Sequence, residues 1–113
     1  MTTESNGAPP ARYFHLDQLP SLPDDPYREF LRVPSLNCGV YRLAAGQPDL
    51  QSPHDEDEVY YVVAGRGRFK AGEEDQAVSP GSVLFVRAGI EHRFHSITED
   101  LEILVFFSSA PSR

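Results

Sequence analysis

The sequence contains one cysteine, Cys38, and no long run of apolar residues. A single cysteine excludes a disulfide within the chain, and a reducing cytoplasm is then the default compartment. The uninterrupted apolar runs, such as Ile103 to Phe107, fall far short of the roughly 20 residues that a membrane-spanning helix needs. The opening residues, Met1 to Ala8, lack the basic and apolar regions of a signal peptide. We therefore expect a soluble, cytoplasmic protein.

Positive charge is also scarce. The chain has 10 lysines and arginines against 17 acidic residues, which gives a formal net charge of −7. The basic residues are not clustered, so the electrostatic surface that nucleic acids or anionic membranes require is missing. At 113 residues the chain suits one domain, which would bury roughly two thirds of the surface that its unfolded form exposes. Neither a nucleic acid nor a membrane is expected as a partner.

The first part of the chain has no stretch that could form a long helix without an interrupting proline. Residues 1–12 are mostly small and polar, with prolines, and predict a flexible tail ahead of a single domain over residues 13–113. Four prolines between Tyr13 and Pro34 exclude a long helix there, although Phe14 to Leu19 has room for one turn. Tyr27 to Val33 is suited to an edge strand.

The rest of the chain alternates between short apolar runs and turn residues. Gly65-Arg66-Gly67 predicts the turn of a hairpin, and Thr98 to Asp100 predicts another polar turn. Strands separated by turns about every ten residues indicate an all-β sandwich or barrel. The expected strands are Leu36–Ala44, Val59–Val63, Arg68–Ala71, Gln76–Ser79, Ser82–Arg87, His92–His95 and Leu101–Phe107.

A histidine and a glutamate four residues apart lie at the centre of the chain, between Gly46 and Gly65. If this segment is extended, His54 and Glu58 point to the same face, and Tyr60 continues that face. The His54 imidazole and the Glu58 carboxylate would then both point into the interior of the fold.

This spacing resembles the first motif of the cupin superfamily. That motif runs glycine, five residues, His, any residue, His, three or four residues, Glu, six residues and glycine. Gly46, His54, Glu58 and Gly65 fall in register, whereas Ser52 stands where the family has its first His.

The second cupin motif follows at the expected separation. It reads glycine, five residues, proline, any residue, glycine, two residues, His, three residues and asparagine. Gly81, Gly89 and His92 match, while Arg87 replaces the proline and Ser96 the asparagine. Together the two motifs cover roughly half of the chain, and the resemblance implies an all-β, jelly-roll-like cupin barrel (a double-stranded β-helix).

The resemblance implies a metal site made by His54, Glu58 and His92. Two imidazoles and one carboxylate suit Fe(II), and Mn, Ni, Co or Zn are also admissible because nitrogen and oxygen sites discriminate poorly by affinity. Ser52 is a weak ligand that could hydrogen-bond a metal-bound water or take no part. Gln51 could supply an amide oxygen instead, if a bulge at Pro53 breaks the strict alternation.

Two further side chains are candidates for proton transfer. Tyr60 is either a core aromatic or a proton donor beside the metal. Glu56 lies two residues from both His54 and Glu58, so in an extended segment it would share their face and could act as a base. Alternatively, it could lie in the loop before the strand. His95 has the opposite parity to His92 and is expected to be structural.

The lining of the barrel interior follows from the same parity. Phe94, Val62 and Phe85 should form an apolar wall of the kind that binds small molecules. The sequence does not decide which face of Leu36–Ala44 points into the barrel. Either Arg42 points inwards, where it could meet an anion, or Tyr41 does. The basic residues of Arg68–Ala71 and its turn, which are Arg66, Arg68 and Lys70, are expected on an exposed face.

Two classes of function remain open on the sequence. One is a small metal-dependent enzyme, dioxygenase- or isomerase-like, that acts on a small molecule in the barrel mouth. The other is a non-catalytic module that binds a small ligand or metal, or a barrel that has lost its metal. Small cupins often exchange an N-terminal strand between subunits, so the resemblance also implies a homodimer. The residues themselves are equally compatible with a strand, Tyr27 to Val33, that packs on its own barrel.

Overall fold

The computed structural model describes residues 10–108. Most of the predicted tail, residues 1–9, lies outside the described residues. The single helical turn expected between Phe14 and Leu19 is the 3-10 helix η1 (Leu16–Gln18), which His15 caps by accepting a hydrogen bond from the Asp17 amide. No helix in the described part of the chain is long and apolar enough to cross a membrane.

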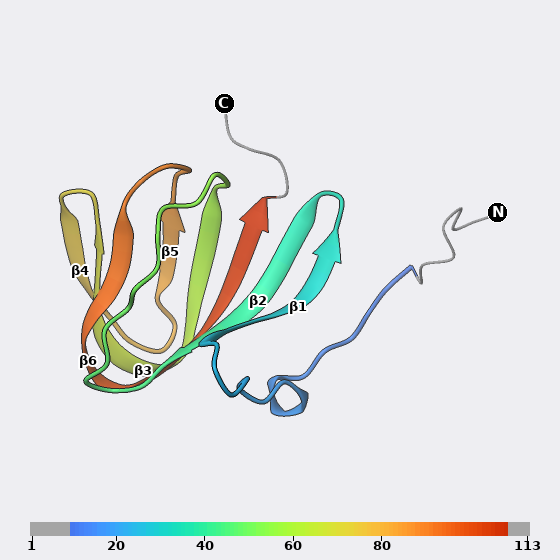
Figure 1. Cartoon of the computed structure of the whole chain (residues 1–113), viewed down its shortest axis with the longest axis horizontal. Coiled ribbons are helices and arrows are strands. Elements are labelled where there is room, and N and C mark those ends of the chain that lie inside the picture. The colour runs from blue at the N-terminus through green and yellow to red at the C-terminus, as the bar shows by residue number, and fades with distance from the viewer. Residues whose placement is uncertain (1–9, 109–113) are drawn as a thin grey trace.

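The remaining structure is β, as predicted. The strands form one antiparallel sheet in the order β1-β2-β6-β3-β4, and β5 pairs with β3 beside β4. Figure 1 shows this sheet curving round until its two ends stand opposite each other. The strands are β1 (Tyr27–Val33), β2 (Leu36–Leu43), β3 (Glu58–Ala71), β4 (Glu74–Val78), β5 (Val83–Val86) and β6 (His92–Ser108).

The two long strands, β3 and β6, connect the halves of the fold. The first residues of β3 lie between β5 and the end of β6, whereas its last residues lie between β4 and the start of β6. In Figure 1, β6 bends between its orange first part and its red last part. The bend brings the beginnings of β3 and β6, which carry Glu58 and His92, to the same interior.

The two predicted turns inside these strands are wrong. Gly65-Arg66-Gly67 does not turn the chain back but lies within β3, where register shifts mark bulges between Val62 and Arg68. Gly65 has a φ of +96°, and a Cβ there would lie 2.1 Å from the carbonyl oxygen of Asp100. The glycine therefore serves a bulge and a close strand crossing, which local turn chemistry does not distinguish from a hairpin. Thr98–Asp100 is likewise part of β6.

The core fills the inside of the curved sheet. Tyr60, Val62, Phe94 and Ile103 are almost completely buried. Phe85, expected among them, is instead 64% exposed. It is Val86 that pairs with Glu58 and points inwards, so its neighbour Phe85 points out.

The open question about β2 is settled in favour of the apolar wall. Tyr41 and Leu43 are buried in the core, whereas Arg42 forms an ion pair with Glu102, with 2.9 Å between Nη2 and Oε2. The basic residues near the end of β3 are exposed as expected, and Arg68 pairs with an aspartate of β4.

Candidate metal centre

Three potential metal ligands converge on one interior point. His54 lies in the loop between β2 and β3, Glu58 begins β3 and His92 begins β6. One ligand atom from each lies within 4.8 Å of the others. The Glu58 Oε1 atom is 2.6 Å from His92 Nε2, and Glu58 Oε2 is 3.8 Å from His54 Nε2. Both Glu58 and His92 are buried, so this group could hold a metal away from bulk water.

Backbone contacts explain why the loop carrying His54 reaches the other two residues. The Gly89 amide donates to the His54 carbonyl at 2.8 Å, and the Ala88 amide donates to Asp57 Oδ1 at 2.8 Å. These bonds fasten the first motif to the turn before β6. Of the residues predicted to share a strand face, Glu58 and Tyr60 lie in β3, whereas His54 is brought to them by the loop.

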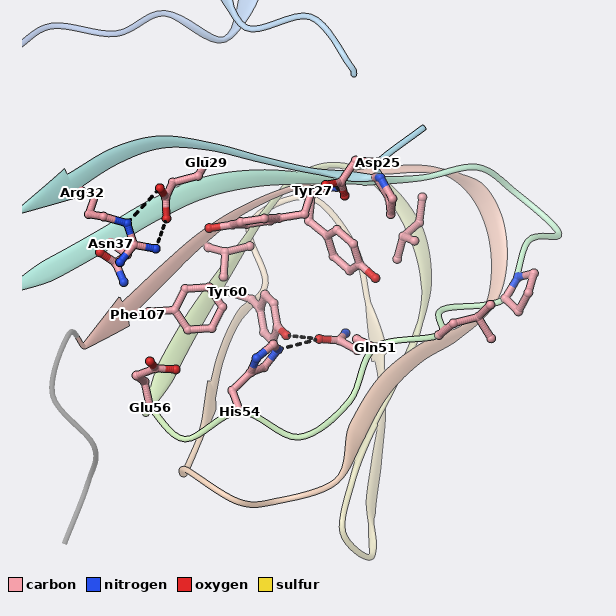
Figure 2. Close-up of a pocket in the computed structure, with 16 residues that line it drawn as sticks. Asp25, Tyr27, Glu29, Arg32, Asn37, Gln51, His54, Glu56, Tyr60 and Phe107 are labelled. Carbon is pink, nitrogen blue, oxygen red and sulfur yellow. Dashed lines mark hydrogen bonds and ion pairs between the residues drawn. The ribbon is translucent and has the colours of Figure 1, made fainter. Parts of the chain in front are cut away.

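Gln51 completes the group. Its Oε1 atom is 3.1 Å from His92 Nε2 and 3.4 Å from His54 Nε2. Figure 2 shows this amide pointing towards His54 and Tyr60. Ser52, which stands at the position of the missing histidine, is exposed.

Asp49 fixes the orientation of the Gln51 amide. Its Oδ2 atom accepts hydrogen bonds from Gln51 Nε2 at 2.6 Å and from the Phe94 amide at 2.8 Å. Its Oδ1 atom accepts from the Tyr41 hydroxyl. Because the amide nitrogen of Gln51 is held by this buried carboxylate, its oxygen must face the imidazoles. Sequence reasoning missed Asp49, since a polar residue in a loop gives no sign of being buried.

The protonation of His92 follows from its contacts. Its Nδ1 lies 2.7 Å from the Ile90 carbonyl, to which it donates, so Nε2 faces Glu58 and Gln51. Burial lowers the pKa of His92, but the hydrogen bonds to Glu58 and Ile90 outweigh it and leave the pKa above its ordinary value. Within residues 10–108, Glu58 Oε2 is buried without a hydrogen-bond partner. An unpartnered buried carboxylate oxygen is the kind of atom that a cation would satisfy.

Tyr60 lies directly beside the group. Its hydroxyl is 2.6 Å from Glu58 Oε1 and 3.0 Å from both Gln51 Oε1 and His92 Nε2. Burial, followed by the neighbouring Glu58 carboxylate, raises the pKa of Tyr60 far above its usual range. The phenol therefore keeps its proton and acts as a hydrogen-bond donor.

A cavity of about 560 Å³ opens next to these residues. Gln51, His54 and Tyr60 contribute to its inner wall, and Glu56 also lines it. The Tyr27, Tyr41 and Phe107 rings are part of the remaining wall. Figure 2 shows β1 and β2 above the cavity and the loop with Gln51 and His54 below it. The cavity has room for a small molecule.

The spacing of the donor atoms fits a transition metal. Neighbouring ligands at roughly 2.1 Å from an octahedral ion lie about 3 Å apart. The separations of Gln51 Oε1 and Glu58 Oε1 from His92 Nε2, at 3.1 and 2.6 Å, bracket that value. The residues present therefore fit a metal with two nitrogen and two oxygen ligands.

Comparison with known proteins agrees with this architecture. The sequence matches the family model described as the cupin domain over residues 39–107. The chain belongs to the cupin family. The predicted cupin barrel is thereby confirmed, and both predicted motifs lie inside the matched segment.

Individual cupins resemble the chain to different degrees. An uncharacterized protein of Streptomyces coelicolor is 46% identical over 102 residues, which cover 88% of this chain and 97% of that protein. The structure of KdgF from a Halomonas species has a TM-score of 0.76 at 20% identity and covers 91% of this chain and 96% of its own, a likeness that shows the fold alone. The DMSP lyase DddQ from Ruegeria pomeroyi has a TM-score of 0.63 at 25% identity over 67% of this chain, which spans 39% of that lyase.

Proposed function

We propose that this cupin binds one divalent transition metal through Gln51, His54, Glu58 and His92, and that it is a metal-dependent enzyme acting on a small molecule. The observation that carries the proposal is the convergence of four donor side chains beside a cavity. Gln51 supplies the fourth donor in place of the histidine that the first motif lacks.

The donor set favours Fe(II), and Mn, Co, Ni or Zn are also compatible with it. A bound metal would supply Lewis acidity and, as Fe(II), redox chemistry. An octahedral ion held by these four residues would leave two positions for substrate oxygens. Dioxygenase-like and isomerase-like reactions both use such adjacent oxygens, and the similarity to a DMSP lyase adds elimination to the activities worth testing.

Tyr60 and Glu56 are the residues that we propose for proton handling. In this proposal the Tyr60 phenol, which is protonated and lies 2.6 Å from Glu58 Oε1, donates a hydrogen bond to a substrate oxygen near the metal. Glu56 is only partly buried at the cavity wall, where a carboxylate can exchange protons with water. It is our candidate for a general base.

We also propose that the protein is a cytoplasmic homodimer. Val83 and Phe85 of β5 are 66% and 64% exposed, and they pair in register with Tyr61 and Val59 of β3. An apolar patch on the outer face of a sheet is typical of a protein interface. Phe85→Glu should turn the dimer into a monomer in light scattering coupled to size-exclusion chromatography, and unchanged mass would reject this face as the interface.

The metal proposal is tested by elemental analysis of protein purified without added metal, followed by chelation and reloading. We expect about one metal per chain, and we expect His54→Ala to abolish it. His95→Ala is the matched control, because His95 pairs with Asp75 near the surface. Loss of metal in both variants, or in neither, would contradict the assignment.

Catalysis is tested separately from binding. The Fe(II) protein is assayed for oxygen uptake with catechols, diketones and thiols, and the Mn, Co, Ni and Zn forms for isomerisation and elimination. Turnover that disappears in Tyr60→Phe with metal retained supports the enzyme. Stoichiometric metal with no turnover across the panel favours the non-catalytic binding module instead.

A further inference from the structure

The wall of the cavity formed by β1 and β2 contains two buried polar atoms without partners. The Tyr27 hydroxyl and Asn37 Oδ1 have no hydrogen-bond partner among the described residues. Asn37 is 7% exposed, and both residues line the cavity that adjoins the metal ligands. Buried polar groups are nearly always paired in folded proteins, so an unpaired donor and acceptor on one cavity wall indicate a missing ligand group.

The position of the Tyr27 ring depends on Gly39. A Cβ at Gly39 would lie 2.3 Å from both Cζ and the hydroxyl oxygen of Tyr27, so the ring lies directly on the glycine backbone. The ring also packs edge-on against Tyr41 and Phe107. Burial raises the pKa of Tyr27 well above its usual range, and the phenol remains a hydrogen-bond donor. The glycine thus makes room for a tyrosine that lines the cavity and whose hydroxyl is buried.

Charges in the same region exclude an anionic ligand group. Arg32 is the cationic side chain of the described cavity lining, and it is engaged by Glu29, with Nη2 2.8 Å from Oε1 and Nε 3.1 Å from Oε2. Asp25 and Glu56 add two more carboxylates to the wall. Figure 2 shows Arg32 bound to Glu29 beside Asn37. A carboxylate or phosphate would therefore meet net negative charge and no free cation.

We infer that Tyr27 and Asn37 form a subsite, remote from the metal ligands, that binds a neutral hydroxyl group of a polyhydroxylated small molecule. A hydroxyl group can satisfy either atom, since it can donate to Asn37 Oδ1 and accept from the Tyr27 phenol. The inference deepens the proposed function, because the same cavity would hold the metal-binding end of the ligand.

The test compares three six-carbon carboxylates that differ in the substituents on their carbon chain. Gluconate carries hydroxyls, hexanoate carries none, and 6-aminohexanoate ends in a cation. Isothermal titration of the Mn(II)-loaded protein should give at least about tenfold tighter binding for gluconate than for the other two. Tyr27→Phe and Asn37→Leu should each weaken gluconate about five- to tenfold and leave hexanoate unchanged. Tyr61→Phe, which changes an exposed tyrosine, should alter neither.

Two further measurements separate this inference from the metal proposal. Both variants should bind Mn(II) as the unmodified protein does, and the preference for glucitol over 1-hexanol should persist in metal-free protein by saturation-transfer NMR. Because the atoms removed are unpaired, Tyr27→Phe should leave the melting temperature of the ligand-free protein unchanged or higher. Equal binding of the three carboxylates, a preference for 6-aminohexanoate, or destabilised variants with intact gluconate binding would each overturn the subsite.

Discussion

Asp49 Oδ2 accepts a hydrogen bond of 2.6 Å from Gln51 Nε2, and this contact decides which end of the Gln51 amide faces the imidazoles. The nitrogen end of an amide cannot bind a metal, whereas its oxygen can. If Gln51 is the fourth ligand that we propose, two residues take the place of the missing histidine: Gln51 offers the donor atom, and Asp49 sets its orientation.

The first prediction concerns this pair. Asp49→Asn replaces a carboxylate, which only accepts hydrogen bonds, with an amide, which can bond to either the nitrogen or the oxygen of Gln51. The Gln51 side chain therefore loses its fixed orientation. Changes to such outer partners of a ligand typically cost 10- to 100-fold in metal affinity. We expect a loss in that range by competition with a chromogenic chelator. Asp75→Asn, at an exposed aspartate of β4, is the control and should leave the affinity unchanged.

The second prediction distinguishes Gln51 from its neighbour. Gln51→Ala removes an oxygen 3.1 Å from His92 Nε2, and the metal affinity should fall at least about tenfold. Ser52→Ala changes an exposed side chain and should have no effect. The reverse order of effects would mean that Ser52, rather than Gln51, holds the fourth position.

The third prediction is a pair of opposite pH dependences. The pKa of His92 in the metal-free protein is raised above its ordinary value. Its pairing with Glu58 therefore stabilises the fold fully at pH values below the His pKa of the unfolded chain, about 6.5. This stabilisation is lost as the pH rises through the pKa of His92 in the folded protein. A metal competes with the His92 proton, so its affinity should fall by about tenfold per pH unit below that folded value. Thermal melts of the chelator-treated protein and metal titrations between pH 5 and about 8 measure the two slopes. Slopes of the same sign would contradict the assignment of His92.

The fourth prediction concerns the bulge at Gly65 in β3. Gly65→Ala combines a positive φ with a Cβ placed 2.1 Å from the Asp100 carbonyl oxygen, and should destabilise the fold by roughly 3–5 kcal/mol. Gly46→Ala has a similar φ of +79° but open space around the added Cβ, and should cost only about 1–2 kcal/mol. Urea unfolding of both variants gives the comparison. Equal losses would show that the strand crossing is not tight.

The sequence allowed the all-β class and most strand positions to be predicted, because alternation and turn residues report local structure. It did not reveal that β3 and β6 continue through Gly65 and Thr98. The same glycines and polar residues serve a hairpin and a bulge equally well, and only pairing with a distant strand separates the two cases. The outward facing of Phe85 was missed for a related reason, since strand register decides it.

For the candidate site, the motif spacing was sufficient to select His54, Glu58 and His92. The contribution of Gln51 was predicted only as an alternative, and that of Asp49 not at all. Both depend on how a loop places side chains, which periodicity does not describe. The unpaired Tyr27 and Asn37 atoms are likewise visible only when β1 and β2 are folded over the cavity.

Anomalous scattering from a crystal of the metal-loaded protein tests the central claim most directly. We predict one ion per chain, bound by Gln51 Oε1, His54 Nε2, Glu58 and His92 Nε2, with its remaining positions open to the cavity. An ion bound elsewhere, or no ion at this point in fully reloaded protein, would contradict the account.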